Sequence, residues 1–240
     1  MIKIGILKET KTPIDNRVAL TPAEIVALRE KYPHAEFYVQ ESDIRAYEDE
    51  AYRAAGIPVV KSLEDCDVLF GIKEAKVESL MPNKHYFFFG HIAKMQPYNK
   101  PLIKKMIELG ITFSDYEYLV DDAGQRLCAF GWWAGVVGAY NTIRAYGIRT
   151  RKFELEKPSR TFTLEKLLAN VKEVLPLCNT SVLITGNGRV SQGAQYVLQQ
   201  MGAKELLPED FLQGADRSQL IYTVLKTPDL VAHKDGREYN

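Results

Sequence analysis

Residues 181 to 203, SVLITGNGRVSQGAQYVLQQMGA, constrain the fold more than any other part of the chain. An apolar, β-branched run precedes a glycine-rich turn, and a helical pattern follows the turn before a second short apolar run. This succession is typical of a strand, a tight turn, a helix and a further strand. The segment therefore predicts a βαβ unit of a parallel sheet.

The turn contains Gly186 and Gly188, spaced as in loops that bind dinucleotides. In such loops the first glycine allows a sharp reversal, and the second lets the backbone approach a pyrophosphate at the positive N-terminus of the following helix. The third glycine of the pattern would fall on Ser191, a small residue that still permits close packing. Glycine spacing alone is weak evidence, but the strand before the turn and the helix after it favour a cofactor site over a purely structural turn.

The cofactor expected at this turn is NAD, with NADP as the open alternative. An acidic residue about 20 positions after the glycines commonly binds the ribose, and the sequence does not choose among the three candidates. These candidates are Glu205, Glu209 and Asp210. The predicted cofactor contacts are Gly186, Gly188, Arg189, Val190 and Glu209.

The first 150 residues alternate β-rich runs with helical patterns, which predicts a parallel-sheet α/β domain. The expected strands span residues 3–7, 36–40, 68–72, 86–89 and 112–115, and the expected helices span 22–31, 49–55, 99–108 and 131–146. A charged, proline-containing stretch, 149–160, predicts a domain boundary near it. We therefore expect a Rossmann-like α/β domain over residues 1–150 and an incomplete Rossmann dinucleotide-binding domain over residues 151–240.

Chemically versatile side chains follow successive expected strands of the first domain. Lys73 and Glu74 come directly after the strand 68–72, and His91 follows the strand 86–89. Because open α/β sheets bind ligands at the carboxyl ends of their strands, these side chains could share a cleft. A lysine and a histidine beside a carboxylate can move protons as amine oxidation requires. Glu117 lies on the same edge, where its charge would shift the pKa of its neighbours.

Arg17, between the first strand and the first helix, could reach the same edge and bind a substrate carboxylate through two parallel hydrogen bonds. Taken singly, each of these charged residues would more often be an ordinary surface group. Their joint placement after successive strands is what favours a catalytic cleft. His34, His85 and His233 have no comparable context and are interpreted as surface or packing residues.

Composition excludes several classes of function. The 31 basic residues balance 31 acidic ones, so the chain has no overall field to attract nucleic acid or an anionic membrane. Its longest apolar stretch, residues 130–139, is shorter than the ~20 residues that a membrane-spanning helix needs. The N-terminus does not resemble a secretory signal, so a cytoplasmic protein is expected. The widely spaced Cys66, Cys128 and Cys178 support neither a disulfide nor a metal site.

Several motifs in order resemble a known family. They are KIGILKETKTPIDNRVALTP, GIKE, FFFGH and the glycine turn. Together they resemble alanine dehydrogenase, the lysine-forming saccharopine dehydrogenase and the nucleotide-binding part of nicotinamide nucleotide transhydrogenase. FFFGHIAKMQ, DYEYLVDDAGQR and AFGWWAGVVGA look more like the saccharopine enzymes. The resemblance implies two α/β domains, NAD on the second, and amino-acid oxidation through an imine that water hydrolyses.

The resemblance also implies roles for individual residues. Lys73 looks like the acid/base group for the substrate amine, and His91 looks like the group that activates water. Glu74 and Glu117 look like the carboxylates that tune this pair.

Arg17 and Arg126 look like binders of substrate carboxylates. The function so implied is NAD-dependent conversion of saccharopine to lysine and 2-oxoglutarate, with alanine dehydrogenase or a related reductive aminase as the alternative. The chain after Gly193 is too short for the second half of a dinucleotide-binding domain, which predicts a fragment or a naturally shortened relative. A non-catalytic binding module is therefore a third possibility, and a half-built sheet would favour association with another copy of the chain.

Overall fold

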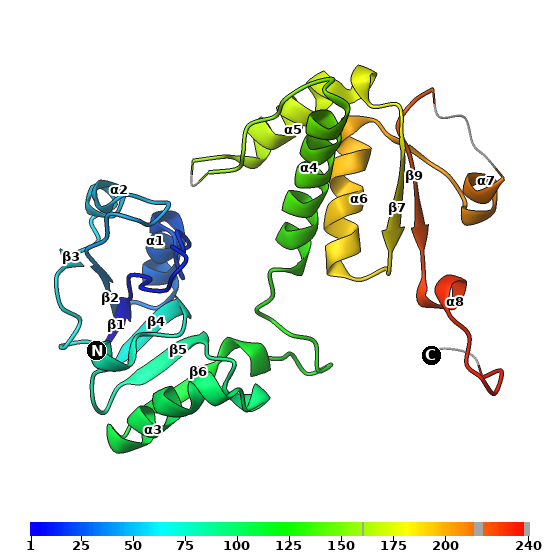
Figure 1. Ribbon diagram of the computed structural model, residues 1–240. Coiled ribbons are helices and arrows are strands. Elements are labelled where there is room, and N and C mark those ends of the chain that lie inside the picture. Colours follow the sequence, from blue (N-terminus) through cyan, green and yellow to red (C-terminus); the bar gives the residue numbers. More distant parts are fainter. Residues whose placement is uncertain (160, 214–217, 238–240) are drawn as a thin grey trace. The chain divides into compact units, whose positions relative to one another are not determined.

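The computed structural model describes residues 1–159, 161–213 and 218–237. It divides into two compact units, Met1–Cys128 and Ala129–Asn240 (Figure 1). Each unit contains a parallel β-sheet with helices packed on it, which confirms the predicted α/β class.

The first unit holds a parallel sheet of six strands in the order β3-β2-β1-β4-β5-β6. The strands are β1 (Ile2–Ile6), β2 (Ala35–Gln40), β3 (Val59–Val60), β4 (Val68–Lys73), β5 (His85–Phe89) and β6 (Thr112–Asp115). Five of them match the expected strands to within about one residue. The two-residue β3 was not predicted, because so short a run carries no periodic pattern.

The order of the strands reverses between β1 and β4. After β1 the chain adds β2 and β3 on one side of the sheet, and it then returns to add β4, β5 and β6 on the other side. In open α/β sheets such a reversal leaves a crevice at the carboxyl ends of the two central strands, and ligands bind there. The fold therefore singles out the loops that follow β1 and β4.

Helices cover both faces of this sheet. Helix α1 (Pro22–Lys31) begins with a capping box, in which the Thr21 hydroxyl and the Glu24 carboxylate each accept a hydrogen bond from a backbone amide. Together with α2 (Asp49–Ala54) it buries one apolar cluster around Ile6. Helix α3 (Lys100–Glu108) packs on a second cluster that contains Tyr86 and Phe88 of β5.

The second unit contains three parallel strands and five helices among the described residues. They are α4 (Gly131–Thr150), α5 (Leu164–Val174), β7 (Ser181–Thr185), α6 (Arg189–Met201), β8 (Lys204–Glu205), α7 (Pro208–Leu212), β9 (Ile221–Leu225) and α8 (Thr227–Leu230). The predicted strand, turn and helix at the glycines are present. The strand order is β7-β9-β8, so β9 lies between the two strands of the predicted βαβ unit.

The boundary between the units differs from the expected one near residue 150. Helix α4 belongs to the second unit because it lies in backbone contact with α6: a Cβ atom added to Gly135 would lie 1.9 Å from the carbonyl oxygen of Val190. A Cβ added to Gly193 would lie 2.0 Å from the carbonyl oxygen of Trp132. The charged stretch that suggested the boundary also packs here, since Phe153 and Leu155 contact the core of the second unit. The division falls at Cys128 and Ala129 instead.

Candidate functional site

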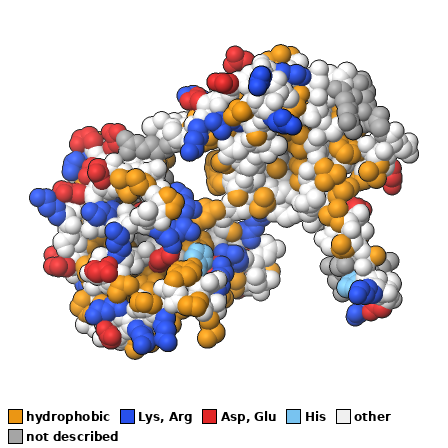
Figure 2. Space-filling view, viewed as in Figure 1, with side chains coloured by type: hydrophobic (Ala, Val, Ile, Leu, Met, Phe, Trp, Pro, Cys, Tyr) orange, Lys and Arg blue, Asp and Glu red, His pale blue; other side chains and the backbone are white. Residues whose placement is uncertain are grey.

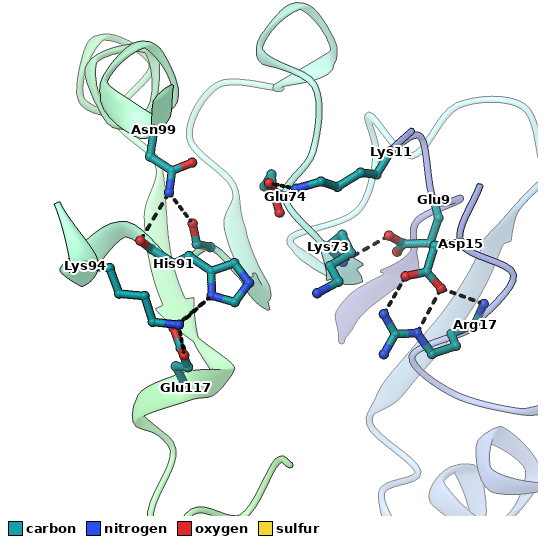
Figure 3. Close-up of polar contacts among 11 residues, drawn as sticks. Glu9, Lys11, Asp15, Arg17, Lys73, Glu74, His91, Lys94, Asn99 and Glu117 are labelled. Atoms are coloured by element: carbon teal, nitrogen blue, oxygen red, sulfur yellow. Dashed lines mark hydrogen bonds and ion pairs between the residues drawn. The ribbon is translucent and has the colours of Figure 1, made fainter. Parts of the chain in front are cut away.

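The residues predicted after successive strands of the first unit do share one edge of the sheet. Lys73 is the last residue of β4, His91 follows β5, and Glu117 lies in a single helical turn, Tyr116–Tyr118, after β6. Parallel pairing aligns these strand ends, with Lys73 opposite Phe89. Figure 3 shows the side chains of Lys73 and His91 on neighbouring segments of this edge.

His91 and Glu117 form a hydrogen-bonded pair. The Nδ1 atom of His91 lies 3.1 Å from Oε2 of Glu117. The tautomer that satisfies this contact carries its proton on Nδ1, which leaves Nε2 to accept a proton from another group. Such a pair is suited to general-base chemistry, because the carboxylate orients the ring and stabilises the imidazolium that forms when a proton is taken up.

Lys94 joins this pair, although its role was not predicted from the sequence. Its Nζ atom lies 2.8 Å from Oε1 of Glu117 and 3.3 Å from Nδ1 of His91. The hydrogen bond from Lys94 and that from His91 hold the pKa of the Glu117 carboxyl below its usual range. The same contact raises the pKa of the Lys94 ammonium. Glu117 is therefore a fixed negative charge beside the imidazole of His91.

The backbone that presents His91 is tightly specified. His91 adopts a left-handed conformation with φ of 51°, which L-residues rarely adopt. The buried side-chain amide of Asn99 donates to the carbonyl oxygens of Gly90 at 3.2 Å and His91 at 3.1 Å (Figure 3). These hydrogen bonds offset the strain and set the direction in which the imidazole leaves the backbone.

Lys73 is positioned from the opposite side by Glu9, in the loop after β1. The Glu9 carboxylate is 8% exposed and accepts hydrogen bonds from the backbone amides of Ile72 at 2.7 Å and Lys73 at 3.0 Å. Regular pairing of β4 with β5 is interrupted between Phe70 and Lys73, so Glu9 supplies acceptors where the register shifts. Burial raises the pKa of the Glu9 carboxyl, and the two amide donors oppose that rise.

The side chain of Lys73 projects from this anchored backbone. Its Nζ atom lies 6.0 Å from the centre of the Phe89 ring. Lys73 and the loop that holds Glu9 flank the point where the strand order reverses, which is where ligands bind in sheets of this kind. The amine of Lys73 thus lies beside the reversal of strand order between β1 and β4, where sheets of this kind bind ligands.

Glu74 pairs with Lys11, a residue whose role was not predicted from the sequence. One of its carboxylate oxygens is paired with Lys11 (Figure 3). The other oxygen, Oε2, is buried and has no hydrogen-bond partner among the described residues. A buried carboxylate oxygen is costly to leave unpaired, so this atom is available to a positively charged or hydrogen-bonding ligand.

The two predicted carboxylate binders lie in different surroundings. Arg17 donates from Nε to Oδ1 of Asp15 at 2.8 Å and is 40% exposed at its side chain. Its hydrogen bond lowers the pKa of the Asp15 carboxyl. Arg126 pairs with Val120 in a short antiparallel bridge. Glu117 raises the pKa of the Lys94 ammonium, and the positive charge of Arg126 opposes this rise. Arg126 is therefore close enough to interact electrostatically with Lys94, which lies beside both His91 and Glu117.

The glycine turn of the second unit fits a dinucleotide phosphate. Gly186 has φ of +82°, and its amide donates to the carbonyl oxygen of Leu225 at 2.7 Å. A Cβ at Gly186 or at Gly188 would meet no heavy atom within 4 Å, so the backbone here faces open space. Gly188 is the N-cap of α6 and the next two residues, Arg189 and Val190, are exposed. Backbone amides and the positive end of a helix are therefore open to an anionic group.

The remaining predicted contacts of the turn have mixed outcomes. Ser191, at the third glycine position, is buried, as close packing requires. The closest approach of backbones, however, is at Gly193. Glu209 lies in α7, after β8, and β8 has no contact with β7 in the sheet. Its binding to the ribose stays a prediction.

The described ranges contain neither a membrane-spanning helix nor a cluster of metal-ligating side chains. No described helix has the length and apolar character needed to cross a membrane. No group of three or more His, Cys, Asp or Glu side chains in those ranges could hold a metal ion.

The protein has two α/β units of the Rossmann-like class. Its charged residues lie where the strand order of the first sheet reverses, and its glycine turn lies in the second unit. The chain belongs to the family of alanine dehydrogenase/PNT, N-terminal domain, whose family model matches residues 5–137. That range includes Lys73, His91 and Glu117 and ends before the glycine turn.

Known proteins resemble the chain beyond this range. An alpha-aminoadipic semialdehyde synthase of Arabidopsis thaliana is 29% identical and matches 97% of the chain and 25% of the relative. A saccharopine dehydrogenase [NAD(+), L-lysine-forming] of Yarrowia lipolytica is 27% identical over 85% of the chain and 58% of the relative. The chain thus spans about a quarter of the first and somewhat more than half of the second.

Solved structures show the same fold at lower identity. An L-alanine dehydrogenase matches with a TM-score of 0.55 and 18% identity over 92% of this chain and 60% of that one. A transhydrogenase from Sinorhizobium meliloti matches with a TM-score of 0.60 and 17% identity over 91% of this chain and 64% of that one.

Proposed function

We propose that the chain carries the catalytic residues and the first part of the cofactor site of an amino-acid dehydrogenase of the saccharopine type. The observation that carries this proposal is the placement of Lys73 and the His91–Glu117 pair along one edge of the sheet, beside the reversal of strand order. The name of one sequence relative, a saccharopine dehydrogenase [NAD(+), L-lysine-forming], supports saccharopine as the substrate.

The proposed reaction converts saccharopine, water and an oxidised nicotinamide dinucleotide into lysine, 2-oxoglutarate and the reduced dinucleotide with release of a proton. When bound, the nicotinamide accepts the hydride that leaves the substrate carbon. Lys73 accepts the proton of the substrate amine as the carbon–nitrogen double bond forms. His91 then takes a proton from water as the water oxygen adds to that carbon, and Lys73 returns its proton to the nitrogen. As the carbon–nitrogen bond breaks, the hydroxyl proton passes to Lys73 and His91 gives its proton to the departing nitrogen, so one proton is left on Lys73 for release to solvent.

Charged groups around this edge suit a substrate with carboxylates and an amine. Arg17 and Arg126 are the proposed carboxylate ligands, and their guanidinium groups can each donate two parallel hydrogen bonds. The unpaired Oε2 of Glu74 would accept from a protonated amine of the substrate. Gly186 and Gly188 would hold the pyrophosphate of the dinucleotide, with Arg189 and Val190 beside it.

The test is turnover of saccharopine by the purified chain with NAD or NADP. Lys73→Met should lower kcat by about 100-fold or more, the range typical of a lost general acid or base. Lys76→Met is the matched control, because this exposed lysine lies three residues further on and outside the site. Equal losses in the two variants, or full activity in Lys73→Met, would remove Lys73 from the mechanism.

The alternatives make different predictions in the same assay. Turnover of alanine in place of saccharopine would support an alanine dehydrogenase or related reductive aminase. Binding of a dinucleotide without turnover of either substrate would favour a binding module or a piece of a longer enzyme. Cytoplasmic location and assembly into a homo-oligomer remain predictions from the sequence.

A further inference from the structure

Helix α3 of the first unit presents apolar side chains to solvent. Ile103 and Ile107 lie one turn apart on the side of the helix that faces away from the core, and Ile107 is 75% exposed. Met95, in the loop before the helix, is 88% exposed. Apolar side chains that gather on a surface, rather than lying singly, are typical of sites that bind another protein. We call these three residues, together with the exposed Lys100 and Lys104, the α3 surface.

A cavity of about 470 Å³ opens on this surface, between the loop and the first turn of α3. Its walls are mainly apolar and include Ile92, Met95, Pro97 and Ile103, while Lys100 is the charged residue in its lining. Cavities of this size can hold a small organic molecule, so this one can receive an apolar side chain of a partner protein. Apolar pockets of this kind are where the strongest contacts of protein interfaces commonly form.

The charge of the α3 surface is positive. Lys100 and Lys104 lie one turn apart on the exposed side of the helix, and neither makes an ion pair with the described residues. Glu108, the acidic residue of α3, is already paired with Lys105 at 3.1 Å. A partner suited to this surface therefore combines apolar side chains with acidic ones.

Helix α7 of the second unit has this combination. Leu207, at its N-cap, is exposed, and Leu212, its last residue, is 77% exposed. Glu209 and Asp210, between them, are exposed and make no ion pair with the described residues. Figure 1 shows α7 projecting beside β9, on the side away from α4 and α6. In Figure 2 hydrophobic side chains lie among basic ones over α3 and beside acidic ones over α7.

We propose that α7 of a second copy of this chain binds to the α3 surface. Leu212 enters the cavity beside Ile103, and Asp210 pairs with Lys100. Burial of these apolar side chains is favourable because they are exposed to water in the single chain. The opposite charges beside the cavity set the orientation of α7. Each copy carries both elements, so a two-fold dimer contains the same contact twice.

The contact also reaches the loop that carries His91. Asn99 lines the cavity, and its side-chain amide donates to the His91 carbonyl oxygen at 3.1 Å. Ile92 follows His91 directly and lines the same cavity. A side chain of the second copy in this cavity therefore packs against the segment that orients the imidazole.

Disulfide cross-linking tests which chain provides the occupant. Ile103→Cys and Leu212→Cys are made in separate full chains, each with Cys128→Ser so that the remaining native thiols are buried. Only one of the two chains carries an affinity tag, and the mixture is oxidised with copper phenanthroline. We expect a cross-linked dimer that contains both chains. Val26, on α1, is as exposed as Ile103, so Val26→Cys in place of Ile103→Cys is the matched control and should lose this product.

The outcomes separate a second copy from other occupants. Absence of the mixed dimer, or equal yields with Ile103→Cys and Val26→Cys, would overturn the proposal. A chain with both Ile103→Cys and Leu212→Cys tests for binding within one molecule. If it loses both free thiols on oxidation and remains a monomer on a non-reducing gel, α7 occupies the α3 surface of its own chain and the proposal is wrong.

Sedimentation equilibrium measures the contact without added cysteines. Lys100→Glu and Asp210→Lys should each weaken self-association by about fivefold or more, because each replaces an attraction by a repulsion. A mixed dimer of the two variants has opposite charges at both contacts, so mixing them should restore association. Lys31→Glu, which alters an exposed lysine of α1, is the control and should associate like the unaltered chain. An unaltered chain that stays monomeric at its highest soluble concentration, or variants that do not recover on mixing, would overturn the proposal.

Discussion

The carboxylate of Glu9 holds the backbone of Lys73 through a hydrogen bond of 3.0 Å from the Lys73 amide. Its second oxygen accepts the amide of Ile72 at 2.7 Å. The carboxylate is nearly fully buried, so both amides would be left without acceptors if it were removed. An unsatisfied buried donor costs about 1–3 kcal/mol, which makes Glu9 a determinant of both stability and the direction of Lys73.

Glu9→Gln is the sharpest test of this arrangement. Glutamine has nearly the same shape, but its amide nitrogen cannot accept a hydrogen bond, so one of the two backbone amides would face another donor. We expect the free energy of unfolding to fall by about 1–3 kcal/mol and kcat to fall more than KM changes. Urea denaturation and steady-state kinetics measure the two effects.

Glu24→Gln provides the matched comparison. The carboxylate of Glu24 also accepts a backbone amide, that of Thr21 at 2.7 Å, but it caps α1 and does not touch Lys73. This variant should retain kcat. Unchanged kcat in Glu9→Gln, despite reduced stability, would show that Glu9 serves the fold alone.

Lys94→Met should change the titration of Glu117. The hydrogen bond from Lys94 is the largest cause of the lowered pKa of Glu117, followed among the lowering contacts by that from His91. Because the pKa is lowered in the folded state, the ionised carboxylate contributes stability above its unfolded pKa, and this contribution is lost as pH falls through the lower folded pKa. Without Lys94 the folded-state pKa of Glu117 should rise towards its unfolded value, so this contribution should be smaller and its loss should be complete at a higher pH.

Carbon-detected NMR titration of the Glu117 carboxyl measures this shift directly. Lys104→Met, which removes an exposed lysine from α3, is the control and should leave the Glu117 pKa in place. If the activity profile at low pH moves together with the Glu117 titration in Lys94→Met, Lys94 acts through the His91–Glu117 pair. A Glu117 pKa unchanged by Lys94→Met would contradict the proposed ion pair.

Local patterns were sufficient to predict most of the first unit. The apolar run VLFGI predicted the strand at 68–73 to within one residue, because a buried parallel strand needs a continuous apolar run. The position of α4 could not be predicted in this way. Only the approach of Gly135 to Val190 in the structure shows that the partner of α4 is α6, and the division between the units accordingly falls at residue 128.

The order of strands in the second unit was also beyond the sequence pattern. Sequential strands commonly pair, but β8 does not pair with β7, the strand before it in the chain. Instead β9 pairs with both of the other strands. This order depends on long-range contacts, which a local sequence pattern does not show.

The candidate catalytic residues were predictable for a different reason. Lys73, His91 and Glu117 each follow a strand, and parallel topology alone brings such residues to one edge. Glu9 and Lys94 have no such signal, because their roles depend on contacts with a backbone bulge and with a carboxylate from another loop. Residues that position others are therefore harder to predict than the residues they position.

The three free cysteines should differ in reactivity towards iodoacetamide. Burial raises the pKa of Cys66 and that of Cys178 to about 11, and both thiols are nearly inaccessible. Cys128 is only half-buried. Since the thiolate is the reactive form, Cys128 should be alkylated first at pH 8, as measured by peptide mass spectrometry. Rapid labelling of Cys66 or Cys178 in the folded chain would contradict the buried positions.

The contact between α4 and α6 should be intolerant of a single methyl group. In Gly135→Ala the new Cβ would lie 1.9 Å from the Val190 carbonyl oxygen, so the helices would have to separate. We expect the second unit to lose about 3 kcal/mol or more of stability, comparable to the larger penalties for overpacking a core. Thermal unfolding followed by circular dichroism measures this loss.

Gly138→Ala, in the same helix, is the control because a Cβ at Gly138 would meet no heavy atom within 4 Å. Alanine is favoured over glycine inside a helix by about 1 kcal/mol, so this variant should be as stable as the unaltered chain or more stable. Opposite effects of the two substitutions would establish that α4 belongs to the second unit through close backbone packing. Similar effects would mean that α4 and α6 do not approach as closely as the structure shows.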